Sequence, residues 1–183
     1  ENKKKIAENL FVTVKTQLED YIKKVFGGIT ISQIYSKIQP HKRFTKLQYE
    51  ININEDSGIP ELYMKVLNNE KEDLMPELFF SSAQLNTVAL SMFLGGALST
   101  ANPNVQSIFI DDPVGHFDDL NVLSFIDVLR TIITETGWQI VISTHEESFY
   151  ELMKVKLSPR YYNSKFFVFQ EEGKIKEDVK FGW

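Results

Sequence analysis

Two adjacent aspartates, Asp111 and Asp112, directly follow a short apolar segment, residues 108–110. This pattern is typical of a buried parallel strand whose carboxyl end opens on a ligand crevice. One carboxylate at such a position can hold Mg²⁺, directly or through water, and its neighbour can orient and deprotonate an attacking water molecule. A strand that merely runs into an acidic turn fits the same residues, so both interpretations stay open.

A histidine follows a second apolar segment. Residues 140–142 run into Ser143, Thr144 and His145. A histidine just after a buried strand commonly acts as a capping or hydrogen-bonding residue. In a nucleotide site the same side chain can sense the γ-phosphate and position the attacking water.

A run of small residues, Ser81, Ser82 and Ala83, stands at the start of a predicted helix. The free backbone N–H groups of a helix start, aided by the helix dipole, attract a phosphate. Small side chains also let that phosphate approach the backbone closely. The alternative is an ordinary serine cap with no contact outside the helix.

Strands and helices alternate around these residues. The predicted elements are a helix over 81–98, a strand over 107–110, a helix ending near 136, a strand over 138–143 and a helix over 146–157. The first helix is apolar nearly all round and both strands are of the buried type. Asp118 or Asp119 caps the second helix, and Gly137 closes it. This order favours parallel βαβ units.

Helices and an antiparallel ribbon precede this region, and a hairpin follows it. The predicted elements are a helix over 3–26, a helix over 31–38, strands over 44–54 and 62–66, and a hairpin of 166–169 with 174–180. Gly27-Gly28, Pro40 and residues 56–58 provide the helix stops and the turn of the ribbon. We predict a helical segment over 1–40, either the end of a coiled coil or a plain amphipathic helix, and one lobe over 41–183.

Composition narrows the class of protein. The 183 residues include no cysteine, which excludes disulfides, thiolate zinc sites and cysteine nucleophiles. No apolar stretch reaches the roughly 18 residues that span a bilayer, and we expect a cytoplasmic protein with no membrane partner. The formal net charge is −5, yet basic residues outnumber acidic ones in residues 1–50, as in a solvated basic helix or a segment near nucleic acid. Because the sequence begins without Met, we expect a piece of a longer chain.

Taken together and in this order, the motifs resemble those of the ABC ATPases of the SMC, Rad50 and RecN type. Residues 80–84, Phe-Ser-Ser-Ala-Gln, resemble the ABC signature, usually written Leu-Ser-Gly-Gly-Gln. Residues 108–112 resemble Walker B, residues 113–118 the D-loop, and residues 143–145 the switch histidine. The resemblance implies an α/β fold: the carboxy-terminal lobe of a P-loop NTPase-like ABC ATPase head, with a mostly parallel sheet flanked by helices, an antiparallel ribbon and a carboxy-terminal hairpin.

The resemblance also implies a role for each matching residue, with ATP and Mg²⁺ as cofactors. Asp111 would hold Mg²⁺, and Asp112 would be the general base for water. Asp118 would contact the opposite subunit, and His145 would read the γ-phosphate. The γ-phosphate of ATP on the partner head would be bound by the signature residues Ser81, Ser82, Ala83 and Gln84.

The sequence departs from the family pattern in three respects. Asp112 stands where most members have Glu, and its shorter side chain predicts slow turnover. Ser82-Ala83 replaces the usual glycine pair. No Gly-x-x-x-x-Gly-Lys-Ser/Thr loop occurs, since the single Gly-Lys pair, Gly173-Lys174, is followed by Ile. The phosphates would therefore need a Walker A-bearing amino-terminal lobe as a partner.

The resulting hypothesis is an ATPase that acts as an ATP-gated clamp. Two heads would sandwich two ATP molecules, and hydrolysis would release them. The implied partners are a second head, DNA, and a nuclease or effector subunit, in DNA repair, chromosome maintenance or anti-phage defence. Two alternatives stay open: a nucleotide-dependent dimerisation clamp with little hydrolysis, and a metal-dependent nuclease that uses Asp111, Asp112, Asp118, Asp119, His116 and His145.

Overall fold

The computed structural model describes residues 2–26, 29–38, 43–53, 59–68, 70, 73–99, 105–171 and 173–178. The chain divides into two compact units, Glu1–Gln106 and Ser107–Trp183, and each unit is described by itself. The predicted stops Gly27-Gly28 and Pro40, and the predicted turn at residues 56–58, lie outside the described residues. No helix in the described part is long and apolar enough to cross a membrane.

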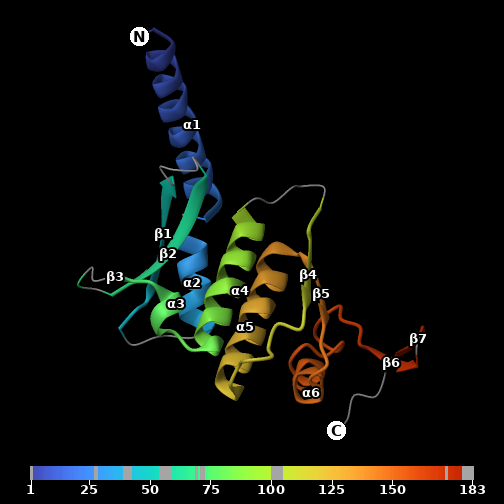
Figure 1. The fold of residues 1–183 in the computed structure, drawn as a ribbon. Helices are drawn as coiled ribbons and strands as arrows, with labels where there is room; N and C mark the ends of the chain where they lie inside the picture. Colours follow the sequence, from blue (N-terminus) through green and yellow to red (C-terminus); the bar gives the residue numbers. More distant parts are fainter. Residues whose placement is uncertain are drawn as a thin grey trace. The chain divides into compact units, whose positions relative to one another are not determined.

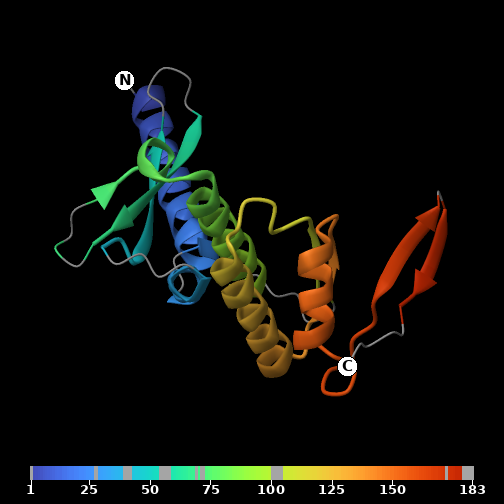
Figure 2. The same cartoon turned by 90° about the horizontal axis from the view of Figure 1, so that it is seen from below.

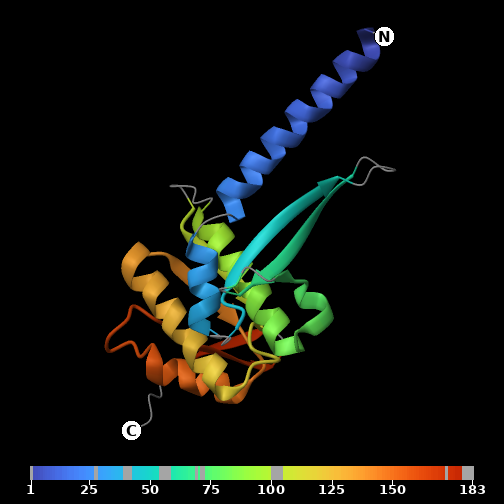
Figure 3. The ribbon, with the colours of Figure 1, turned by 90° about the vertical axis from the view of Figure 1, so that its left-hand side faces the viewer.

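The first unit begins with two helices, α1 (Asn2–Phe26) and α2 (Ile29–Ile38), as predicted (Figure 1). The apolar residues of α1 recur every three or four positions, and no proline or glycine interrupts it. Figure 3 shows α1 as one continuous helix that extends away from α2. Its apolar side chains Ile6, Leu10 and Val14 are exposed, so no element in the described part of the chain covers that stripe.

A small antiparallel sheet follows the two helices. Strand β1 (Lys46–Ile53) pairs with β2 (Pro60–Leu67), which also pairs with the short β3 (Asp73–Leu74). The predicted two-stranded ribbon is thus part of a three-stranded sheet. The buried core of this unit joins the ribbon to its helices through Ile31, Tyr35, Leu47, Met64, Val66 and Val88. Burial raises the pKa of Tyr35 to about 12.

Helix α4 (Ser82–Ser99) follows a single-turn helix, α3 (Pro76–Phe79), that the sequence patterns did not predict. The composition of α4 predicted a helix that is buried on all sides. Phe93 of α4 is nevertheless 47% exposed, so within the described residues one face of this helix stays open. The buried face packs on α2 at Gly95. A Cβ atom at Gly95 would lie 2.1 Å from Ile31 Cγ1, so only glycine permits this approach.

The second unit contains one parallel strand pair. Strands β4 (Ser107–Asp111) and β5 (Gln139–Ser143) lie parallel, with Asp111 opposite Ser143. Helix α5 (Asp119–Thr136) connects them, and α6 (Glu147–Lys156) follows β5. This is the predicted βαβ order. An antiparallel hairpin of β6 (Phe167–Glu171) and β7 (Lys174–Glu177) ends the described chain (Figure 2).

Local signals set the ends of α5. The Asp118 side chain accepts a hydrogen bond from Asn121 N at 2.8 Å, which makes Asp118, rather than Asp119, the cap. At the other end Gly137 takes the left-handed conformation at φ 70° and donates its N–H to Ile133 O. Between these ends, α5 buries Phe125, Ile126 and Leu129 completely.

Burial of the two parallel strands differs from the prediction. Phe109 of β4 is 70% exposed and Val141 of β5 is 40% exposed, although both strands read as buried. Phe109 and Val141 are register partners and lie on the same face of the strand pair, and within the described residues that face is incompletely covered. Among the described residues β5 also pairs with β4 alone, so its other edge is open. Apolar strands of this composition normally have neighbours on both edges and layers on both faces.

Candidate functional site

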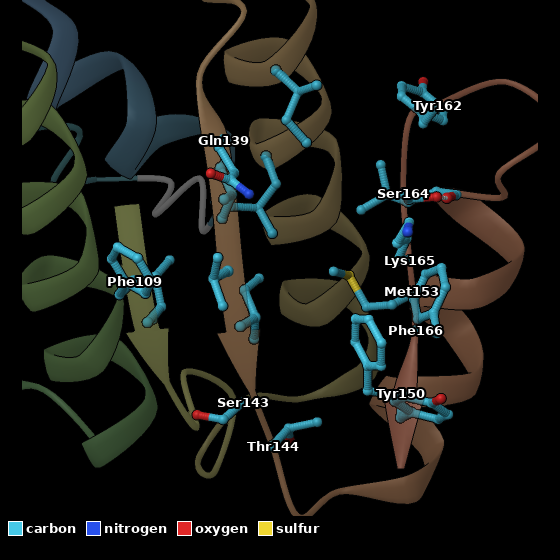
Figure 4. Close-up of a pocket in the computed structure, with 18 of the residues that line it drawn as sticks. Phe109, Gln139, Ser143, Thr144, Tyr150, Met153, Tyr162, Ser164, Lys165 and Phe166 are labelled. Atoms are coloured by element: carbon cyan, nitrogen blue, oxygen red, sulfur yellow. Dashed lines mark hydrogen bonds between the residues drawn. The ribbon is translucent and has the colours of Figure 1, made fainter. Parts of the chain in front are cut away.

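The carboxyl ends of β4 and β5 meet at Asp111 and Ser143. The two residues are register partners, and the Ser143 hydroxyl donates a hydrogen bond to Asp111 Oδ1. Figure 4 shows Ser143 and Thr144 together at this end of β5. Because parallel strands end on the same edge of a sheet, the two predicted motifs become neighbours here.

Asp112 turns the chain sharply at the end of β4. Its φ is 45°, and it has the sole positive φ of a non-glycine residue in the described chain. Its backbone N–H donates to Ser143 O at 2.8 Å, which extends the strand pairing by one bond. The left-handed region costs an L-residue about 1–2 kcal/mol, and aspartate is among the residues that tolerate it. Backbone strain at this position is a feature that functional sites often carry.

Both oxygens of the Asp112 carboxylate have partners from the segment after β5. The Thr144 hydroxyl donates to Asp112 Oδ1 at 3.1 Å, and His145 Nδ1 lies 2.7 Å from Asp112 Oδ2. A carboxylate only accepts hydrogen bonds, so the proton of this contact is on Nδ1 of the imidazole. His145 Nε2 lies 3.5 Å from Glu146 Oε1. The His145 side chain is 74% exposed, which leaves the ring free to turn toward a ligand.

Asp118 follows on the next turn. The turn is held by a hydrogen bond from Phe117 N to Val114 O at 2.8 Å, after which Asp118 caps α5. Its carboxylate is exposed, and one oxygen is already used by the cap. In the described structure Asp118 therefore has a structural role as the cap of α5, and its predicted contact with an opposite subunit stays a prediction.

The signature-like motif lies in the first unit and forms a local structure there. Ser81 Oγ accepts from Gln84 N at 3.3 Å, and Gln84 Oε1 accepts from Ser81 N at 2.9 Å. This reciprocal pair is a capping box. The serine cap, the alternative weighed from the sequence, is thus present. Ser82 and Ala83 occupy the first turn, where helix geometry leaves backbone N–H groups without an intrahelical partner.

The chemistry of the donors at the strand ends suits a magnesium ion. Asp111 and Ser143 offer carboxylate and hydroxyl oxygens, and Mg²⁺ takes one or two carboxylates while it keeps several waters and phosphate oxygens. No group of three or more His, Cys, Asp or Glu side chains that could hold an ion occurs within the described ranges. The described residues thus give the nuclease alternative no preformed cluster of three such ligands, and that alternative stays a prediction.

The sequence patterns pointed to Asp111, Asp112 and His145, and the structure brings these three together. The sequence patterns did not predict the contacts of Ser143, Thr144 and Glu146. In the sequence these residues stood out only because they lie next to His145. Their position at the end of a strand was the one available signal, because side chains there lie beside the end of the adjacent parallel strand.

The chain has the fold of SMC ATPase head domains. A structure from work on ATP-driven dimerization and DNA-stimulated activation of SMC ATPases matches with a TM-score of 0.62 at 17% identity, over 90% of this chain and 88% of that chain. An SMC head bound to the C-terminal winged-helix domain of ScpA matches with a TM-score of 0.61 at 18% identity, over 90% of this chain and 44% of that chain. The Smc head of Pyrococcus yayanosii, with a coiled coil and joint, gives 0.58 at 15% identity, over 95% of this chain.

This likeness is one of fold. The chain spans less than half the length of the ScpA-bound head and of the Pyrococcus yayanosii head. By sequence, no family model and no curated protein matches. The structural matches confirm the predicted resemblance to an SMC-type ATPase head at the level of the fold.

Proposed function

We propose that this chain is the carboxy-terminal lobe of an ATP-binding and ATP-hydrolysing head of SMC or Rad50 type. The observation that carries the proposal is the meeting of Asp111 and Asp112 with Ser143, Thr144 and His145 at the ends of two parallel strands. ATPases of the P-loop class need an acid for the metal, a base for water and a group that reads the γ-phosphate at this edge of the sheet.

The residues at this edge divide those tasks among them. Asp111, supported by the Ser143 hydroxyl, would hold Mg²⁺. Asp112 would accept a proton from the attacking water, since its carboxylate has about four lone-pair positions and the observed contacts use two. His145 would turn from Asp112 toward the nucleotide and orient the water. Bound Mg-ATP supplies the phosphoanhydride bond that is broken.

A partner lobe with a Walker A loop completes the head in this proposal. A cavity of about 1100 Å³ lies within the second unit, between β5 and the segment that leads into β6 (Figure 4). Apolar side chains line it from both sides, among them Val141, Met153 and Phe169. Within the described ranges the second edge of β5 has no paired strand, so its backbone groups can pair with a further strand. A strand of the amino-terminal lobe would pair with this edge and fill the cavity.

A second head would face the signature residues and the D-loop. Ser81, Ser82, Ala83 and Gln84 would present first-turn N–H groups to ATP on the opposite head. Asp118 would contact the opposite subunit, and the neighbouring Leu120, 74% exposed, would be buried there. The exposed apolar stripe of α1 supports a coiled coil over residues 1–40, attached to a lobe over residues 41–183.

We assign the assembled head a cytoplasmic role on DNA, in repair, chromosome maintenance or anti-phage defence, with a nuclease or effector subunit as a further partner. The basic amino-terminal segment supports this assignment, because positive charge near the coiled coil attracts the phosphate backbone. The fold shared with SMC heads supports it as well.

A nucleotide-dependent dimerisation clamp with little hydrolysis is the second candidate. It is favoured by the shorter side chain of Asp112 and by the engagement of both its oxygens. Asp112→Glu separates the two candidates: faster turnover in the assembled head indicates a slow enzyme, and unchanged absence of turnover indicates a clamp.

The decisive experiment measures Mg-ATP binding and hydrolysis by this chain alone and by its mixture with a Walker A-bearing lobe. We expect activity in the mixture only, with hydrolysis lost in Asp112→Asn and dimerisation lost in Ser81→Arg. A mixture that neither binds ATP nor dimerises contradicts the proposal. DNA cleavage by the chain alone without ATP would instead revive the nuclease interpretation.

A further inference from the structure

Thr144 links the start of α6 to the carboxylate of Asp112. Its hydroxyl oxygen accepts a hydrogen bond from Glu146 N at 3.1 Å, and the same hydroxyl donates to Asp112 Oδ1, with 3.1 Å between the two oxygens. From this arrangement we infer that Thr144 is a positioning residue for Asp112. The inference rests on the proposed function, because it assigns Asp112 as the base.

The direction of this chain of hydrogen bonds is set by its donors. Glu146 N is a backbone donor, so it uses a lone pair of Thr144 Oγ1. A hydroxyl carries one hydrogen, and that hydrogen is then directed to the carboxylate, which has none of its own. Glu146 is the cap residue of α6. The series of hydrogen bonds therefore starts at the backbone of a helix end rather than at a mobile side chain.

Thr144 and His145 contact different carboxylate oxygens of Asp112. The two side chains differ in their freedom to move away from these oxygens. His145 binds Oδ2 with a side chain that is 74% exposed. Thr144 is half-buried and short, and it binds Oδ1 directly after the last residue of β5. When His145 turns to the nucleotide, Oδ2 becomes free to accept the water proton. Thr144 then keeps Oδ1, and with it the plane of the carboxylate, in place.

The contact of Thr144 with Oδ1 matters most because the proposed base is an aspartate. Asp112 already sits in the left-handed region at φ 45°, where its backbone is fixed by Ser143 O. The remaining freedom is rotation of the short Asp112 side chain, which the hydrogen bond at Oδ1 restricts. A misplacement of a reacting group by about 1 Å costs on the order of a hundredfold in rate.

The first test compares Thr144→Val, Thr144→Ser and wild type in the assembled head. We expect Thr144→Val, which keeps the shape and loses the hydroxyl, to lower kcat by about 10- to 100-fold. KM for ATP and ATP-dependent dimerisation should stay within about twofold, since positioning acts on the transition state. Thr144→Ser should restore kcat.

Thr134→Val is the matched control, because it removes a hydroxyl that donates to Arg130 O on the exposed surface of α5. Full kcat in Thr144→Val would overturn the inference.

A second test uses this chain alone and does not depend on hydrolysis. The Asp112 carboxyl-carbon chemical shift and the exchange rate of the Glu146 amide hydrogen report the two hydrogen bonds directly. Both should change in Thr144→Val and return in Thr144→Ser. If neither changes, Thr144 does not position Asp112. If both change while the wild-type assembled head hydrolyses no ATP, the proposed enzyme fails and the positioning contact stands.

Discussion

Asp112 Oδ2 and His145 Nδ1 lie 2.7 Å apart, although the two residues come from the ends of different strands. The proposed base and the proposed phosphate sensor are thus bound to each other in the free chain. His145 must release Asp112 before its ring can turn to a nucleotide, and the exposure of His145 allows this movement.

His145→Gln is expected to lower ATP turnover in the assembled head by about 10²–10⁴-fold, the usual contribution of a positioned acid–base group. The melting temperature should remain close to that of wild type, because the ring is largely exposed. Steady-state hydrolysis and calorimetry on the same preparation check this. Glu135→Gln, in the same unit and also exposed, is the control and should leave turnover unchanged.

Asp118→Ala should destabilise the second unit by about 0.5–2 kcal/mol, because α5 loses its cap. Asp118→Ser should recover most of this stability, since serine caps equally well. Urea unfolding of the two variants measures the effect. If Asp118 also contacts an opposite subunit, the serine variant will be stable and yet fail to dimerise with ATP; dimerisation equal to wild type would limit Asp118 to capping.

Gly95→Ala should destabilise the first unit by about 1–3 kcal/mol, the usual cost of overpacking. The added methyl would lie 2.1 Å from Ile31 Cγ1 and 3.1 Å from Ile31 Cα. This clash exceeds the gain of about 1 kcal/mol that alanine brings to a helix interior. Chemical denaturation of Gly95→Ala, Ile31→Ala and the double variant checks it, and the double variant should be less destabilised than the sum. Strict additivity would show that the two residues do not touch.

Lys154 connects α6 to the residue that follows the hairpin. Its ammonium lies 2.8 Å from Asp178 and 3.1 Å from Glu151, and its side chain is 7% exposed. The hydrogen bond to Asp178, and then that to Glu151, raises the pKa of Lys154 above its ordinary value of 10.5. A raised pKa in the folded state means stability that is present in full below the ordinary pKa and is lost as pH rises through the raised value.

Lys154→Met should therefore cost about 2 kcal/mol at neutral pH, the scale of a hydrogen bond to a charged group. The difference from wild type should shrink above the ordinary lysine pKa of 10.5, where the wild-type contribution itself declines. Urea titrations at pH 7 and in strongly alkaline buffer measure this. Lys156→Met, an exposed neighbour on α6, serves as control. A pH-independent difference would indicate that packing, rather than charge, gives Lys154 its effect.

The sequence by itself determined the features that depend on nearby residues. The ends of α5 follow from Asp118 and Gly137, and the period of α1 follows from apolar residues three and four positions apart. The order of strand, helix and strand also followed from the sequence, because each element has its own pattern of apolar residues. The two-residue β3 and the single-turn α3 were not predicted. Elements this short contain too few residues to show a hydrophobic period.

Tertiary structure decided the relations between distant residues. The contacts of Ser143 with Asp111 and of Thr144 with Asp112 join residues 32 positions apart, and they exist because β4 and β5 pair in parallel with Asp111 opposite Ser143. The positive φ of Asp112 follows from the same geometry, which the residue type tolerates and does not require. The exposure of Phe109 and Val141 was likewise invisible in composition, because an apolar residue is buried only when a neighbouring strand or helix is present to cover it.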